Sequence, residues 1–131
     1  MTTGEAPTPS IGEFITFLYV ENLERSDRFY AGTLGLQLVV DQGSCRIYRV
    51  ATDAYVGVCE RPGRVAAEGL IVTLVSDDVD GWHDRLTAMG VPVDQSPQKS
   101  TVFGVYHAFY RDPDGYQIEI QRFLDPKWAG G

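Results

Sequence analysis

The fold of this 131-residue chain is decided by one stretch near its C-terminus, FYRDPDGYQIEI, residues 109–120. Its segment Asp112-Pro113-Asp114-Gly115 predicts a tight turn, because proline suits the first corner of a turn and glycine accepts a positive φ. In the strand that follows, Glu119 falls on one face, while Ile118 and Ile120 fall on the other. The stretch therefore predicts a β-hairpin that carries a carboxylate on an otherwise apolar strand.

The composition is that of one ordinary globular domain. Hydrophobic residues make up 44% of the chain and charged residues 22%, and the length suffices to bury a core. A net charge of −7 argues against binding to nucleic acid or to anionic membranes. No apolar run is long enough to span a bilayer, and the N-terminus has no signal-peptide pattern. We therefore expect neither a nucleic-acid partner nor a membrane partner.

The two cysteines, Cys45 and Cys59, are not in a metal-binding spacing. Such sparse use of cysteine predicts a protein of the reducing cytoplasm. A structural disulfide between the two is the less favoured alternative.

A strand–helix–three-strand pattern occurs twice in the chain. It lies in a single domain at 11–126, between a flexible leader at 1–10 and a C-terminal tail at 127–131. The first unit, about 14–60, is expected to contain a strand at 14–20, a helix at 24–34, and strands at 37–41, 45–50 and 55–60. After a Pro- and Gly-containing linker at 61–69, the second unit, about 70–123, is expected to contain a strand at 70–76, a helix at 80–89, and strands at 92–94, 101–111 and 116–123.

The two units echo each other in sequence. Asp53-Ala54-Tyr55 matches Asp114-Gly115-Tyr116 at an offset of 61 residues (116 − 55 = 61), and both helices end in a glycine followed by an apolar residue. The repeat predicts an α+β fold in which two tandem βαβββ units form a curled, barrel-like mixed sheet around a central cavity, with the helices outside.

Two motifs carry a family resemblance. One runs from Val20-x2-Leu23-Glu24-Arg25-Ser26 to Phe29-Tyr30-x3-Leu34-Gly35-Leu36, and the other is Asp112-Pro113-Asp114-Gly115-x3-Glu119. Together they resemble the vicinal oxygen chelate superfamily, which includes glyoxalase I, extradiol dioxygenases, fosfomycin-resistance enzymes and bleomycin-resistance proteins. The resemblance covers about residues 14–123. It implies the fold, and also a homodimer, since members commonly pair or swap their βαβββ units, but it leaves the chemistry open.

The resemblance also shows where a metal would be held. Metal-dependent members place a histidine on the first strand of each half and a glutamate on the last strand, and glyoxalases add a fourth ligand at the equivalent of that glutamate in the first half. In this chain the matching positions are Ile15, Ile71, Glu119 and, at the offset of 61, Val58 (119 − 61 = 58). A single carboxylate, even with His107 nearby, is too few ligands for a transition metal. We therefore expect no metal and no cofactor.

The predicted cavity has an aromatic and aliphatic lining with a few polar groups, which is typical of a site for an organic ligand. Alternation along the strands and the repeat offset give the ligand-binding candidates Phe17, Tyr19, Arg46, Tyr48, Glu60, Phe109, Arg111 and Gln121. The alternative is that the aromatic residues only pack the interior of the barrel.

Glu119 has three interpretations. It is a remnant of a metal site neutralised by Arg46 or Arg111, a hydrogen-bond acceptor for a ligand, or a catalytic base with His107 as its acid/base partner. The favoured function is a metal-free protein that binds an aromatic or cationic metabolite or antibiotic, as bleomycin-resistance proteins do by sequestration. The alternatives are a metal-free enzyme of secondary metabolism and a divergent metal-dependent lyase or dioxygenase. An enzyme of this fold would be lyase-, isomerase- or dioxygenase-like, and the sequence names no substrate.

Overall fold

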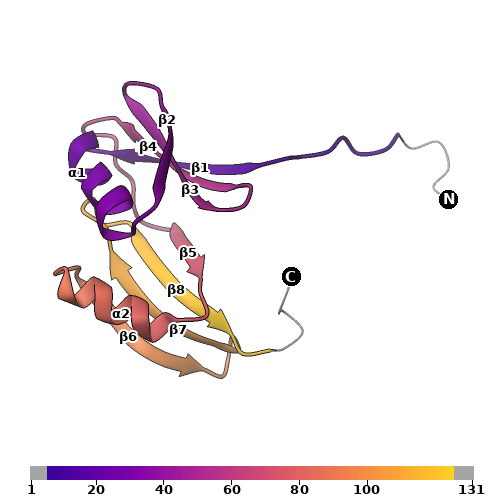
Figure 1. Ribbon diagram of the computed structural model, residues 1–131, viewed down its shortest axis with the longest axis vertical. Helices are drawn as coiled ribbons and strands as arrows, with labels where there is room; N and C mark the ends of the chain where they lie inside the picture. Colours follow the sequence, from indigo (N-terminus) through magenta and orange to yellow (C-terminus); the bar gives the residue numbers. More distant parts are fainter. Residues whose placement is uncertain (1–5, 126–131) are drawn as a thin grey trace.

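The computed structural model describes residues 6–125, so the expected tail and the first half of the expected leader lie outside the described residues. The elements follow the predicted order of strand, helix and three strands, twice over (Figure 1). They are β1 (Phe14–Val20), α1 (Leu23–Asp27), η1 (Arg28–Thr33), β2 (Gln37–Asp41), β3 (Cys45–Ala51), β4 (Ala54–Glu60), β5 (Ile71–Val75), α2 (Val79–Ala88), β6 (Val93–Ser100), β7 (Val105–Arg111) and β8 (Gln117–Phe123). Among the described residues, no helix has the length and apolar composition needed to cross a bilayer.

Each unit forms its own four-stranded mixed sheet, in the order β1-β4-β3-β2 for the first unit and β5-β8-β7-β6 for the second. The first and last strands of each unit pair in parallel, and the other pairs are antiparallel. A parallel pair needs a long crossover, which is where the helix of each unit lies. The predicted α+β fold of two βαβββ units is thereby confirmed. The curled, barrel-like description holds only approximately, because the sheets of the described residues do not join into one.

The predicted helix at 24–34 is present but changes its winding. The side chain of Asn22 caps α1 by accepting the backbone N–H of Arg25 at 2.9 Å. Beyond Asp27 the backbone widens into the π-helical turns of η1, and the N–H of Leu34 donates to the carbonyl of Phe29 at 2.8 Å. Phe29 and Tyr30 of η1 are buried, as are Leu23 and Ser26 of α1.

The expected strands at 92–94 and 101–111 are wrong in their bounds. The structure has a hairpin of β6 and β7, with a turn at 101–104 that is closed by the N–H of Gly104 donating to the carbonyl of Ser100 at 2.9 Å. Pro97 lies inside β6, which is the edge strand of its sheet, and the pairing of β6 with β7 shifts between Gln95 and Gln98. Proline is tolerated at a sheet edge, where its missing N–H breaks no ladder. That proline concealed the strand in the sequence.

The turn at 112–115 is a joint between the two units. The hydroxyl of Tyr30 donates to Asp112 Oδ2 at 2.7 Å, and Asp112 Oδ1 accepts the backbone N–H groups of Asp114 and Tyr116, both at 2.9 Å. Arg25 Nη2 pairs with Asp114 Oδ1 at 2.7 Å. Burial raises the pKa of the Asp112 carboxyl, and burial followed by the nearby Asp112 carboxylate raises the pKa of the Tyr30 phenol. The buried Tyr30 hydroxyl and both carboxylate oxygens of Asp112 have hydrogen-bond partners, which stabilises the joint.

One hydrophobic core runs through both units. It joins Leu18 and Val20 of β1 and the aromatic residues of η1 to Leu86 of α2 and to Ile118 and Ile120 of β8. On β1 the buried Leu18 and Val20 alternate with exposed residues, as period-2 geometry requires. Each sheet therefore has a face turned toward this core and an opposite face, which we call the open face.

Cys45 and Cys59 form a disulfide between β3 and β4, so the expectation of free cysteines is wrong. The two residues are direct cross-strand partners with a Cα–Cα distance of 4.1 Å. The cytoplasmic location stays a prediction, and it loses its original argument because disulfides are rare in reducing compartments.

Candidate functional site

The two units align at an offset of 62 residues rather than the expected 61. In β7–β8, Phe109 pairs with Glu119, and in β3–β4 the corresponding pair is Ile47 with Gly57 (119 − 57 = 62). Because side chains alternate along a strand, an error of one residue moves every assignment to the opposite face of the sheet. The candidate residues of the second unit therefore lie on the face of the sheet that the sequence predicted. The candidates that were transferred to β3 and β4 by the offset of 61 lie on the opposite face.

Glu119 lies on the open face of β8, where two side chains hold its carboxylate. Its Oε1 accepts the hydroxyl of Thr73 at 2.8 Å, and its Oε2 lies 2.7 Å from Nδ1 of His107. The Glu119 and His107 side chains are only 11% and 10% exposed. A deprotonated carboxylate only accepts hydrogen bonds, so Nδ1 of His107 carries a proton, and in the neutral imidazole Nε2 then has the free lone pair. Nε2 has no protein partner among the described residues.

The other second-unit candidates share this face. Phe109 packs edge-on against His107 with ring centroids 4.9 Å apart, and Gln121 pairs across the strands with His107. Arg111 lies at the end of the face and is already occupied, since its Nη1 donates to the carbonyl of Gly115 at 3.0 Å and its Nε pairs with Asp94 at 2.5 Å. The structure thus brings Phe109 and Gln121 to the Glu119–His107 pair and directs Arg111 elsewhere.

The candidates transferred to β3 and β4 are on the wrong face. Arg46 pairs with Glu24 of α1 at 2.8 Å, and Tyr48 donates its hydroxyl to Asp27 at 2.6 Å. The carboxylate of Glu60 accepts the backbone N–H of Leu23, where α1 begins, at 2.8 Å. All three therefore hold α1 against its own sheet, and none lies on the open face. Burial raises the pKa of the Tyr48 phenol, and the hydrogen bond to Asp27 raises it further.

Phe17 and Tyr19 do lie on the open face of β1, as expected, and are 46% and 45% exposed. They belong to the first unit, and no hydrogen-bonded ladder joins their sheet to that of Glu119 within the described chain.

The residues at the family's metal positions do not fit a metal. Ile15 and Ile71 lie on the open faces of β1 and β5, and each pairs at the same register position of its unit, with Tyr55 and Gln117. At the corrected offset of 62, the residue of the first unit that corresponds to Glu119 is Gly57 rather than Val58. Glycine supplies no ligand either. No cluster of three or more potential ligand side chains exists within residues 6–125.

Three contributions to this region had no assigned role in the sequence analysis, which held the disulfide only as the less favoured alternative. Thr73 holds one oxygen of Glu119, Gly57 leaves room for the ring of Phe17, and the disulfide occupies the open face of the first unit. The disulfide stands where the second unit has His107 and Gln121, since Cys45 and Cys59 differ from them by 62 residues (107 − 45 and 121 − 59). An offset of 62 would have predicted both the disulfide pairing and the role of Gly57.

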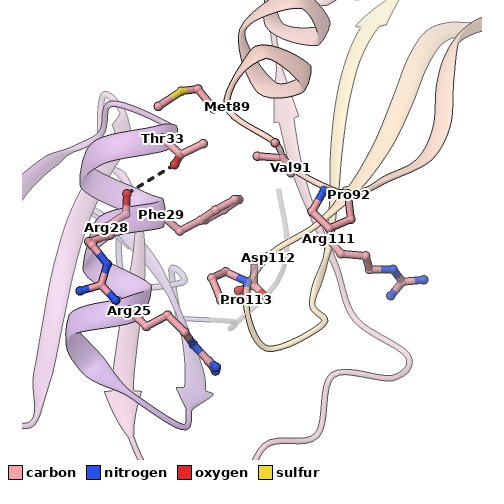
Figure 2. Close-up of a pocket in the computed structure, with 11 residues that line it drawn as sticks. Arg25, Arg28, Phe29, Thr33, Met89, Val91, Pro92, Arg111, Asp112 and Pro113 are labelled. Atoms are coloured by element: carbon pink, nitrogen blue, oxygen red, sulfur yellow. Dashed lines mark hydrogen bonds between the residues drawn. The ribbon is translucent and has the colours of Figure 1, made fainter.

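A separate cavity of about 390 Å³ lies between the units and contains neither Glu119 nor His107. Figure 2 shows Phe29 pointing into this cavity, between Thr33 and Met89 on one side and Pro113 on the other. Its carboxylate, Asp112, is already bonded to Tyr30 and to two backbone N–H groups. The one carboxylate that the described residues give this cavity thus serves the joint between the units, and we assign the functional site to the open face instead.

Comparison with known proteins supports the fold. No curated protein matches the chain. A lactoylglutathione lyase from Agrobacterium tumefaciens is similar in structure, with a TM-score of 0.71, 23% identity, and coverage of 95% of this chain and 98% of that one. TioX from Micromonospora sp. ML1 is similar with a TM-score of 0.71, 22% identity, and coverage of 86% and 98%. A glyoxalase/bleomycin resistance protein/dioxygenase from Nocardioides is similar with a TM-score of 0.69, 18% identity, and coverage of 94% and 89%.

At these identities the solved structures share the fold with this chain, and their activities are their own. The family model for the Glyoxalase/Bleomycin resistance protein/Dioxygenase superfamily matches residues 11–120. The chain therefore belongs to the Glyoxalase/Bleomycin resistance protein/Dioxygenase superfamily.

Proposed function

We propose that this protein binds a small organic molecule without a metal, at a site on the open face of the second unit. The observation that carries the proposal is the pair of Glu119 and His107 on this face. Oε2 of Glu119 lies 2.7 Å from Nδ1 of His107, and both side chains are almost fully buried. Apolar residues of the same face, Ile71 and Val75, are 50% and 59% exposed. A polar pair set among exposed apolar side chains is typical of a ligand site.

Glu119 is better explained as a ligand contact than as a remnant of a metal site. The remnant interpretation needs an arginine to neutralise the carboxylate, but Arg46 pairs with Glu24 and Arg111 with Asp94. Thr73 and His107 hold the carboxylate instead. The imidazole then offers Nε2 to a hydroxyl or N–H group of a ligand. Phe109 beside it offers an aromatic surface.

The proposed site is completed by a second copy of the chain. The open faces of β1 and β5 expose Ile15, Phe17, Ile71 and Val75, and each of these strands is at the edge of its sheet. Exposed apolar edge strands pair readily with another chain. In a two-fold dimer the open face of one copy's first unit would oppose that of the partner's second unit, so that both walls of the site are formed. The function would then be sequestration, as in bleomycin-resistance proteins.

One observation favours a second candidate, a metal-free enzyme that transfers a proton. A carboxylate that fixes Nδ1 of a histidine, and thereby orients Nε2, is the arrangement used for general acid–base catalysis. The pair of Glu119 and His107 has this geometry.

A thermal-shift screen of aromatic metabolites and antibiotics against the full chain tests the proposal, because a ligand that binds only the folded state raises its melting temperature. We expect hits whose affinity falls in Glu119→Gln and His107→Gln, and stays unchanged in the matched control Asp84→Asn, which removes a carboxylate charge at an exposed position of α2. Recovery of the hit unaltered after prolonged incubation indicates sequestration, and its conversion indicates the enzyme. If the affinities of the hits are unchanged in both variants, the site lies elsewhere.

A further inference from the structure

An aromatic platform lies on the open face of the first unit, beside two linker arginines, Arg61 and Arg64, that form no ion pair within the described chain. We define the platform as Phe17 and Tyr19, which project from the same face of β1 and remain nearly half exposed. From the platform we infer that the ligand is a planar aromatic anion, a molecule that carries a carboxylate, sulfonate or phosphate on its ring system. The inference rests on the proposed function, because it describes the wall that would oppose Glu119 in the dimer.

The position of Phe17 depends on a glycine. Phe17 pairs with Gly57 across β1 and β4, and a Cβ on Gly57 would lie 2.4 Å from Cδ1 and 2.5 Å from Cε1 of the Phe17 ring. No carbon atoms approach so closely, so the ring rests against the backbone where only glycine leaves room. Glycine in a strand interior often marks such a close approach. Here it lets a large apolar ring lie against the sheet with one side toward solvent.

The linker after β4 supplies positive charge to this platform. The guanidinium carbon of Arg61 lies 5.8 Å from the centroid of the Tyr19 ring, within range of a cation–π contact. Arg64 lines a cavity of about 190 Å³ together with Phe17, Tyr19 and Tyr116. Within the described chain neither arginine forms an ion pair, whereas Arg25, Arg46 and Arg111 all do.

The neighbouring acidic groups of the described chain bond to backbone N–H groups and form no ion pair with Arg61 or Arg64. Glu60 turns to the opposite face and accepts the backbone N–H of Leu23, and Glu21 accepts the backbone N–H of Gly63. Two guanidiniums without an ion pair in the described chain thus lie at the platform, although the net charge of the chain is −7. The net charge of the whole chain does not describe the groups at this wall.

These features select one class of ligand. A flat ring can stack on Phe17 and Tyr19, and an anionic substituent can then reach the guanidiniums of Arg61 and Arg64, which bind carboxylates and phosphates in a forked geometry. A cation at the same place would meet two like charges. A hydroxyl or N–H group on the far side of the ligand would be left for the Glu119–His107 pair of the partner subunit.

A matched pair of probes tests the inference with the full chain. 2-Naphthoate and 2-naphthylmethylamine share a ring system and carry opposite charges, and calorimetric titration at two salt concentrations gives both affinities. We expect 2-naphthoate to bind more tightly by about tenfold or more, since charge-assisted hydrogen bonds separate the two probes. We expect added salt to weaken its binding. Equal binding of both probes, tighter binding of the amine, or no binding of 2-naphthoate at millimolar concentration overturns the inference.

Variants locate the binding. We expect Arg61→Gln with Arg64→Gln to lower the affinity for 2-naphthoate by about tenfold or more, and Gly57→Ala to lower it by displacing Phe17. The matched charge control is Arg28→Gln with Arg122→Gln, which removes the same charge from residues that are not on the platform. The matched glycine control is Gly32→Ala, where a Cβ meets nothing within 4 Å. Loss of affinity in the controls, or none in the platform variants, overturns the inference.

Glu119→Gln separates this inference from the proposed function. If 2-naphthoate binding survives the platform variants but is lost in Glu119→Gln, the platform is wrong and the proposed site stands. If the platform variants abolish the binding of 2-naphthoate, and the affinities of the hits from the wider screen are unchanged in Glu119→Gln, the inference about the platform is supported and the proposed site at Glu119 is wrong. Amide chemical-shift changes on addition of 2-naphthoate check the location independently, and we expect them at Phe17, Tyr19 and Gly57.

Discussion

Glu119→Gln is predicted to cost little folding stability, and the structure gives the reason. The carboxylate takes two hydrogen bonds, from Thr73 at 2.8 Å and from His107 at 2.7 Å, and no arginine pairs with it. A glutamine of the same shape can satisfy both partners, because its oxygen accepts from one of them and its amide group donates to the other. No buried positive charge is left without a partner.

The magnitude follows from the kind of bond that is exchanged. A hydrogen bond to a charged group contributes about 1.5–3 kcal/mol and a neutral one about 0.5–1.5 kcal/mol, so the substitution should cost roughly 1 kcal/mol. For a domain of this size, that corresponds to a fall in melting temperature of about 3–6 °C. Glu119→Ala is the contrasting variant. It leaves both Thr73 and His107 without a partner and should cost about 2–4 kcal/mol.

Chemical denaturation of the wild type and both variants by urea, with the slope of the transition held in common, measures these differences. A loss above about 3 kcal/mol in Glu119→Gln would refute the reasoning, since only an unpaired buried charge costs so much. Equal losses in Glu119→Gln and Glu119→Ala would refute it too, because the amide would then satisfy neither partner.

Four further outcomes are expected. Reducing the disulfide between Cys45 and Cys59, which are 14 residues apart, should lower the unfolding free energy by about 3 kcal/mol; an unchanged urea midpoint in reductant contradicts this. Tyr30→Phe should cost about 1–3 kcal/mol, because Asp112 Oδ2 loses its buried donor, and calorimetric melting measures the loss. Burial raises the pKa of Asp112 in the folded protein, so its protonation stabilises the fold below the unfolded pKa, and this contribution is lost as pH rises through the raised folded value. The unfolding free energy of the wild type minus that of Asp112→Asn should therefore increase between pH 6 and pH 4, and a difference that stays flat or decreases would contradict this assignment. Sedimentation should show a species of twice 14.5 kDa that Val75→Asp converts to the monomer, and a wild type that is already monomeric at micromolar concentration rules out the dimer.

The turn at 112–115 and the strand after it could be predicted closely from the sequence because their signals are local. The alternation from Gln117 to Gln121 fixed the face of Glu119, and proline and glycine fixed the turn before it. The placement of Phe109 and His107 followed from the same hairpin. Such patterns depend on backbone geometry that neighbouring residues set among themselves.

In the first unit, the prediction of which face the β3 and β4 side chains occupy failed because one turn was misaligned. The matching of Asp53 with Asp114 by residue type was wrong, because the residue that matches Asp53 in conformation is Gly115; both have a positive φ, of 61° and 91°. An aspartate can adopt this conformation, although glycine does so with less strain. That one-residue error moved Arg46, Tyr48 and Glu60 to the wrong face. Identity of residue type could not reveal it, whereas φ does.

The parallel pairing within each unit has a consequence for how the chain folds. β1 closes on β4 and β5 closes on β8, so each sheet has all its strand partners within a continuous stretch of the chain. During synthesis the first sheet can form as soon as residue 60 leaves the ribosome, before the strands of the second sheet have emerged. Contacts between the halves, such as Tyr30 with Asp112 at a separation of 82 residues, can only follow. The halves should therefore behave as two fragments that recognise each other, and a chain cut in the exposed linker should reassemble from its two pieces.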